Sequence, residues 1–121
     1  MVTVIIPALN EEKTVRQVVA LVNRAAQVSE VIVVDDKSMD ATVDEARKEG
    51  ATVITSTKLG KGASMKDGVL VAKNEILVFL DADIATYPDN IIELLSAPII
   101  KDEADFVKSF FSRQAGRVTE L

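Results

Sequence analysis

The sequence predicts an α/β domain with a mostly parallel sheet and helices on both of its faces. Short apolar runs rich in Val and Ile alternate with longer segments in which apolar residues recur every three or four positions. Strands and helices in this order form right-handed βαβ units. The strand-like runs are also continuously apolar, as expected for strands that helices cover on both sides.

The first strand is expected at Thr3 to Ala8, a β-branched run that Pro7 closes. A helix follows at Glu11 to Ala26, where apolar residues keep the spacing of one helix face and acidic residues occupy the first turn. The second strand is expected at Glu30 to Asp35, which is again apolar up to its last residue. These segments predict the first βαβ unit.

The next helix is expected to run through Lys48. Ser38 or Asp40 can cap its first turn, and Gly50 can end it. A short third strand is expected at Thr52 to Thr55. This segment therefore adds one helix and one strand to the sheet.

The remaining sequence continues the alternation. A glycine loop at Gly60 to Gly62 precedes a helix that reaches about Lys73, and a fourth strand is expected at Glu75 to Leu80. Pro88 suits the first turn of a further helix. A fifth strand is expected at Asp105 to Phe111.

Length and composition limit the function classes. The 121 residues suit one domain, 1–121, and the absence of Cys and His excludes disulfides, thiol catalysis and imidazole chemistry. A net charge of −5 argues against nucleic-acid binding. No apolar run approaches the roughly 20 residues of a membrane span, and the first residues lack a basic signal-peptide region. We therefore expect a cytoplasmic protein without a transmembrane segment.

Asp81 and Asp83 directly follow the fourth predicted strand. Ligands of open parallel sheets bind beyond the carboxyl ends of the strands, and side chains two residues apart in extended chain point the same way. Two such carboxylates suit Mg²⁺ or Mn²⁺, which take oxygen ligands and share them with substrate phosphates. A solvated turn or a helix cap is the alternative.

Two further segments lie at the same predicted edge. Asp35 and Asp36 end the second strand, where an acidic group either hydrogen-bonds a nucleoside or caps the following helix. Lys61 lies in a glycine loop that matches neither the Walker pattern nor the dinucleotide-binding fingerprint. Lys61 can meet a diphosphate, although a simple turn is the favoured interpretation of the loop by itself.

Three ordered motifs resemble the nucleotide-sugar half of GT-A glycosyltransferases of the family-2 type. They lie at residues 4–12 (VIIPALNEE), 31–42 (VIVVDDKSMDAT) and 77–83 (LVFLDAD). The resemblance implies a Rossmann-like nucleotide-binding half, a nucleotide-diphosphate sugar (UDP-, GDP- or ADP-hexose) as ligand, and a divalent metal. It covers nearly the whole chain.

The resemblance is narrower than the family. It points to the group of glucosyl- and mannosyl-3-phosphoglycerate synthases, through residues 59–65, 106–113 and 116–121. Members of this group transfer a hexose to 3-phosphoglycerate with retention of configuration. Polyprenol-phosphate glycosyltransferases share the first three motifs, but the pattern at 106–121 is not expected in them. The donor sugar and its nucleobase stay open.

The resemblance also assigns roles to individual residues, and none of them is a catalytic role. The nucleoside would contact Pro7, Ala8, Leu9 and Glu11, with Asp36 or Ser38 near the base. Lys61 would reach the donor's nucleotide, Asp81 and Asp83 the metal and diphosphate, and Arg117 and Thr119 the phosphate of the acceptor. Arg and Thr side chains are suitable phosphate donors.

The sequence departs from the family in two ways. Lys37 stands where the family's turn has Gly. The chain is also shorter than family members and lacks the His that they normally contribute as a metal ligand. We therefore expect nucleotide binding with little or no turnover, and a homo-oligomer that covers apolar surface left by the missing half.

Two other classes of protein share features with this sequence. A non-catalytic nucleotide-binding or assembly module would have the same donor site without an acceptor site. A receiver-type signalling domain is also a small acidic α/β domain with paired carboxylates. Its acidic pair should follow the first strand, whereas the pair here, Asp35 and Asp36, follows the second.

Overall fold

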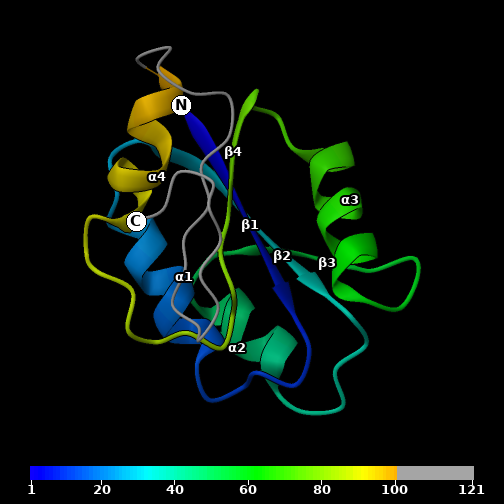
Figure 1. Ribbon diagram of the computed structural model, residues 1–121. Helices are drawn as coiled ribbons and strands as arrows, with labels where there is room; N and C mark the ends of the chain where they lie inside the picture. The colour runs from blue at the N-terminus through cyan, green and yellow to red at the C-terminus, as the bar shows by residue number, and fades with distance from the viewer. Residues whose placement is uncertain (101–121) are drawn as a thin grey trace, which may run out of the picture.

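The computed structural model describes residues 1–100, which form one four-stranded sheet flanked by four helices (Figure 1). The elements in chain order are β1 (Val2–Ala8), α1 (Val15–Asn23), β2 (Val28–Asp35), α2 (Thr42–Lys48), β3 (Thr52–Thr55), α3 (Lys61–Val71), β4 (Ile76–Phe79) and α4 (Ile91–Ile100). The expected order of strands and helices is confirmed over this range. The expected fifth strand lies outside the described residues.

All strand pairs are parallel, and the strand order is β3-β2-β1-β4. In register, Ile5 of β1 faces Ile32 of β2 and Phe79 of β4. The chain adds β2 and β3 on one side of β1 and then crosses over to place β4 on the other side. This reversal creates a switch point between β1 and β4, where open α/β sheets bind ligands.

The two faces of the sheet are covered unequally. Val4 and Ile6 of β1 pack on the face that carries α1, α2 and α4, whereas Ile5 points to the opposite face, where α3 lies against β1 and β2 (Figure 1). Alternate residues of one strand are thus buried on both sides, which explains the continuous apolar run. The prediction of helices on both faces is confirmed.

The single helix α3 leaves apolar side chains exposed on its outer surface. Val69, Leu70 and Val71 are 43%, 73% and 47% exposed, and Leu59 in the preceding loop is 77% exposed. Large exposed apolar patches are uncommon on isolated domains and usually become interfaces. The expectation of a homo-oligomer stays a prediction.

The helix boundaries differ from the predicted ones at both ends. The segment from Glu11 enters α1 through a turn, in which the Val15 N–H donates to the Glu11 carbonyl at 2.9 Å. Neither Ser38 nor Asp40 occupies the N-cap of α2, because the loop between them binds the residues after β1. Pro88 precedes α4 by three residues instead of lying in its first turn.

Gly50 ends α2 as predicted. Its φ is +88°, its N–H donates to the Arg47 carbonyl at 2.9 Å, and the Ala51 N–H donates to the Ala46 carbonyl at 3.3 Å. These are the two bonds of a Schellman motif, which requires a left-handed residue at this position. None of the helices between residues 1 and 100 has the length and apolar character that crossing a bilayer requires.

Candidate functional site

A cavity of about 250 Å³ opens at the carboxyl edge of the sheet, beside the switch point. Eight of the predicted site residues line it: Pro7, Ala8, Leu9, Glu11, Asp36, Lys61, Asp81 and Asp83. Gly60, Ser64 and Ala82 complete the wall. The structure therefore brings residues from four separate segments of the chain into one site.

The loops after β1 and β2 are bonded to each other. The Asn10 N–H donates to Ser38 Oγ at 2.8 Å, and Asn10 Oδ1 accepts from the Met39 N–H at 2.8 Å. The Glu11 N–H donates to Thr42 Oγ1 at 2.8 Å, at the start of α2. The Ser38 hydroxyl thus holds the loop after β1 in place. Ser38, which was predicted near the base, is not among the residues that line the cavity.

The adjacent carboxylates Asp35 and Asp36 have different hydrogen-bond partners. Asp35 accepts from the Ser38 N–H and shapes the turn after β2. Asp36 is 8% exposed and lines the cavity, and its Oδ2 accepts from the Gly60 N–H at 3.0 Å. Asp36 Oδ1 is buried and has no partner within residues 1–100. A ligand with a hydrogen-bond donor would complete this carboxylate.

Lys37, the residue that departs from the family's turn, adopts the left-handed conformation of a glycine, with φ +62°. A side chain in this region costs roughly 1–2 kcal/mol. The hydrogen bonds between this turn and the loop after β1, described above, hold Lys37 in that conformation.

Asp81 and Asp83 lie in the loop after β4. The Asp81 carboxylate forms an ion pair with the Lys61 ammonium at the start of α3, and the Asp81 N–H donates to Tyr87 Oη at 2.8 Å. The Ala82 carbonyl accepts from Thr14 Oγ1 at 2.6 Å. The Asp81–Asp83 segment is thus held from both sides.

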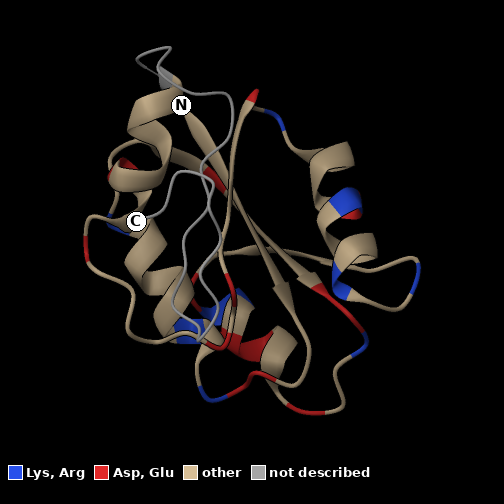
Figure 2. Ribbon diagram, viewed as in Figure 1, with Lys and Arg blue, Asp and Glu red and all other residues tan. Residues whose placement is uncertain are grey.

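The charges around the cavity are mainly negative, and the Asp and Glu residues gather at the edge where the strands end (Figure 2). Burial raises the pKa of the Glu11 carboxyl, and the nearby Asp83 and Asp40 raise it further. Burial also raises the pKa of Tyr87 to about 12, with Asp81 and Asp83 adding to the effect and the Asp81 N–H opposing it. This field favours a bound cation.

The residues that would hold such a cation are two carboxylates. Within residues 1–100 there is no group of three or more His, Cys, Asp or Glu side chains placed to hold a metal ion. Asp81 and Asp83 are nevertheless suitable ligands for a hard divalent cation that takes its other ligands from phosphate and water. The donor set fits a metal that binds together with its nucleotide.

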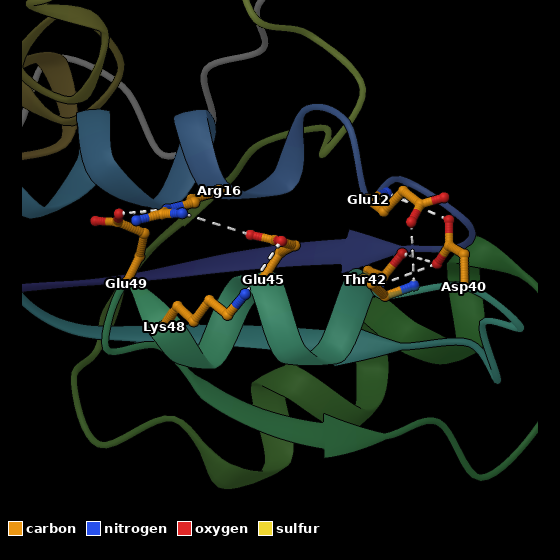
Figure 3. A network of polar contacts seen from close by, with 8 residues as sticks. Glu12, Arg16, Asp40, Thr42, Glu45, Lys48 and Glu49 are labelled. Atoms are coloured by element: carbon orange, nitrogen blue, oxygen red, sulfur yellow. Dashed lines mark hydrogen bonds and ion pairs between the residues drawn. The ribbon is translucent and has the colours of Figure 1, made fainter.

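A polar network behind the site joins α1 to α2 (Figure 3). Arg16 pairs with Glu49 at 2.8 Å and with Glu45 at 3.7 Å. Asp40 accepts from the Thr42 N–H at 3.0 Å, and the Thr42 hydroxyl bond is the main cause that lowers the pKa of Asp40. The ion pairs are exposed and contribute little each. The Thr42 bonds fix the loop that carries Glu11.

Three site residues were not found from the sequence. Gly60 and Ser64 belong to the 59–65 motif, but neither was assigned a role. The φ of Gly60 is +105°, and its N–H donates to Asp36. Tyr87 lies in no motif. The Ser64 signal lies in packing, because α3 places this hydroxyl in the cavity wall. The predicted sites Arg117 and Thr119 lie outside the described residues.

The fold and the cavity define an α/β domain of the Rossmann-like GT-A type. The sequence model described as "Glycosyl transferase family 2" matches residues 3–119. The chain belongs to this family.

Relatives and solved structures agree with that placement. Glucosyl-3-phosphoglycerate synthases from Mycobacterium tuberculosis strain ATCC 25618 / H37Rv and from Petrotoga mobilis are both 30% identical, over 99% and 95% of this chain. They are covered over 45% and 43% of their own length, so the chain spans less than half of these relatives. An uncharacterised glycosyltransferase of M. tuberculosis is 37% identical over 68% of the chain.

Crystal structures of the M. tuberculosis glucosyl-3-phosphoglycerate synthase have the same fold. One, in complex with Mn²⁺, UDP-glucose and phosphoglyceric acid, superposes with a TM-score of 0.86 at 30% identity, over 97% of this chain and 45% of that one. Another, in complex with Mg²⁺ and UDP, has a TM-score of 0.80 at 28% identity, over 91% of this chain and 43% of that one.

Proposed function

We propose that this chain is the donor-binding half of a retaining hexosyltransferase and binds a nucleoside diphosphate sugar together with Mg²⁺ or Mn²⁺ in the cavity. The observation that carries the proposal is the unpaired, buried oxygen of Asp36 in a cavity that also holds Lys61, Asp81 and Asp83. The solved relatives are in complex with UDP-glucose and Mn²⁺ or with UDP and Mg²⁺. UDP-glucose is therefore the first ligand to test.

Each part of the cavity has a role in this proposal. Pro7, Ala8 and Leu9 provide apolar surface for the nucleoside, and Asp36 accepts a hydrogen bond from it. Lys61 pairs with the diphosphate, and Asp81 and Asp83 hold the metal. The metal, when bound, neutralises the charge that develops on the leaving diphosphate.

The acceptor belongs to the same proposal. The relatives are glucosyl-3-phosphoglycerate synthases, and one solved complex contains phosphoglyceric acid, which supports 3-phosphoglycerate as the acceptor. Arg117 and Thr119 are proposed to bind its phosphate, by the family resemblance alone. We propose that residues 1–121 bind the donor and, on their own, transfer hexose slowly or not at all.

A non-catalytic nucleotide-binding module is the second candidate, because every cavity residue assigned above has a role in binding the donor or its metal. The two candidates differ in one measurement. Incubation with UDP-glucose, Mn²⁺ and 3-phosphoglycerate gives a glucosylated product only if the chain is an enzyme. The cytoplasmic location stays a prediction.

Calorimetric titration with UDP, GDP and ADP, each with and without Mn²⁺, tests the binding proposal. We expect binding that requires Mn²⁺ and that Asp81→Asn and Asp83→Asn abolish. Asp89→Asn is the matched control, because Asp89 is exposed and pairs only loosely with Arg24 at 3.8 Å. A folded chain that binds none of the three nucleotides would overturn the proposal.

A further inference from the structure

Two buried side-chain oxygens, Asp36 Oδ1 and Ser64 Oγ, have no hydrogen-bond partner within residues 1–100. Both residues line the cavity, and their exposed fractions are 8% and 0%. Buried polar atoms are nearly always paired, so each unpaired one requires an explanation. Two such atoms in the wall of one cavity indicate a ligand that bonds to both.

Ser64 is tied to Asp36 through the start of α3. The Ser64 N–H donates to the Gly60 carbonyl at 3.1 Å, and the Gly60 N–H donates to Asp36 Oδ2 at 3.0 Å. Lys61, on the same turn, pairs instead with Asp81. Lys61 and Ser64 thus both lie in the first turn of α3, which follows the glycine that bonds to Asp36.

The chemistry of the two unpaired groups selects the part of the ligand that binds there. A carboxylate only accepts hydrogen bonds, whereas a serine hydroxyl both donates and accepts. A phosphate has no donor for Asp36 and is repelled by its charge. A nucleobase edge with an N–H beside a carbonyl, such as the imide edge of uracil, offers a donor to Asp36 and an acceptor to Ser64.

We infer that Ser64 is a nucleoside-reading residue of this site, whose hydroxyl donates to the base carbonyl next to the N–H bound by Asp36. This inference rests on the proposed function and adds a contact that the family resemblance did not assign. It implies opposite effects of one substitution. The hydroxyl is unpaired without ligand, so its removal does not destabilise the free chain, but it weakens nucleoside binding.

The test uses the whole chain and the variant Ser64→Ala. We expect about tenfold weaker binding of UDP with Mn²⁺, a loss that corresponds to one hydrogen bond. The affinity of the variant for uridine, measured by ligand-observed NMR, should fall by the same factor. Its affinity for pyrophosphate with Mn²⁺ should not change. The thermal midpoint of the free variant equals or exceeds that of the wild type.

Ser96→Ala is the matched control. Ser96 is 1% exposed, and its hydroxyl donates to the Ile92 carbonyl at 2.7 Å within α4, outside the cavity. Its removal breaks a satisfied bond, so we expect a lower thermal midpoint and unchanged UDP affinity. Ser64→Ala should therefore lower UDP affinity without lowering the thermal midpoint, and Ser96→Ala should lower the thermal midpoint without changing UDP affinity.

Three results would overturn the inference. UDP affinity of Ser64→Ala equal to that of the wild type would do so and would leave the proposed function standing. Weaker pyrophosphate binding with unchanged uridine binding would make Ser64 a phosphate contact. Absence of UDP binding by the wild type would overturn the inference and the proposed function together.

Discussion

The ammonium group of Lys61 and the carboxylate of Asp81 form an ion pair that joins the first residue of α3 to the loop after β4. Both side chains are partly exposed, at 60% and 39%. Lys61 thus occupies one of the two carboxylates proposed to hold the metal. A metal-bound nucleotide would redirect this lysine from Asp81 to the diphosphate.

Lys61→Ala should therefore separate metal binding from nucleotide binding. We expect tighter binding of Mn²⁺ alone, because Asp81 loses its competing cation, and about tenfold weaker binding of UDP with Mn²⁺, because a charged phosphate partner is removed. Calorimetry with each probe measures both. Lys48→Ala, which removes only an exposed pair with Glu45, is the control and should change neither. Parallel losses for both probes would contradict this competition.

Tyr87 should control stability at alkaline pH. Its pKa is about 12 in the folded chain, above the ordinary value of 10.0. The unfolded chain therefore loses the phenol proton first, and the contribution of this group is complete below pH 10 and is lost as the pH rises towards 12. Tyr87→Phe should lower the free energy of unfolding by about 1–2 kcal/mol at pH 8, because the Asp81 N–H loses its acceptor.

Urea unfolding between pH 8 and pH 11 measures the free energy of unfolding of the wild type and of Tyr87→Phe. The difference between the two proteins isolates Tyr87, because the lysines titrate equally in both. Tyr87 is the only tyrosine, so tyrosinate absorbance follows this single group. We expect the difference between the two proteins to shrink above pH 10. A difference that grows with pH would contradict the raised pKa.

Lys37→Gly should stabilise the chain by about 0.5–1 kcal/mol. The left-handed φ of +62° costs a side chain roughly 1–2 kcal/mol, and the greater freedom of Gly in the unfolded chain offsets part of the gain. Thermal unfolding measures the change. Asn10→Gly is the control, because Asn10 is also left-handed, at φ +53°, but its side chain bonds to the Met39 N–H. That variant should be less stable than the wild type.

Gly68→Ala should destabilise the fold by about 1–3 kcal/mol. A Cβ at Gly68 would lie 2.5 Å from Ile5 Cγ2 and 3.3 Å from Val34 Cγ2, because α3 packs closely on β1 and β2. Gly62→Ala, in the first turn of α3, meets nothing within 4 Å and should be neutral or stabilising. Denaturant unfolding of both variants compares them. Equal stability would show that α3 moves away from the sheet at little cost.

The sequence predicted β1 best, because this strand is buried on both faces. The run from Val2 to Ala8 is buried at every position, and Thr3 is the one polar side chain in it. Helix ends were predicted less well. The loop before α2 bonds across to the loop after β1, through Asn10 and Ser38, and no local pattern contains a contact between residues 28 positions apart.

The sequence predicted those site residues that lie directly after a strand or in a glycine loop. Asp36, Asp81 and Asp83 follow from strand ends, because parallel strands deliver their carboxyl ends to one edge. Ser64 could not be predicted this way. Its place in the cavity wall depends on how closely α3 approaches the sheet, and Gly68, one turn further on, permits that approach.

The strand order also determines when the site is completed during synthesis. β1 is made first, yet its neighbour β4 is 74 positions later in register, where Ile5 faces Phe79. The cavity needs residues from both ends of this interval, from Pro7 to Asp83. We therefore expect a nucleotide to assist the folding of the growing chain only after β4 and the Asp81–Asp83 loop have left the ribosome, when β1, β2 and β3 are already made.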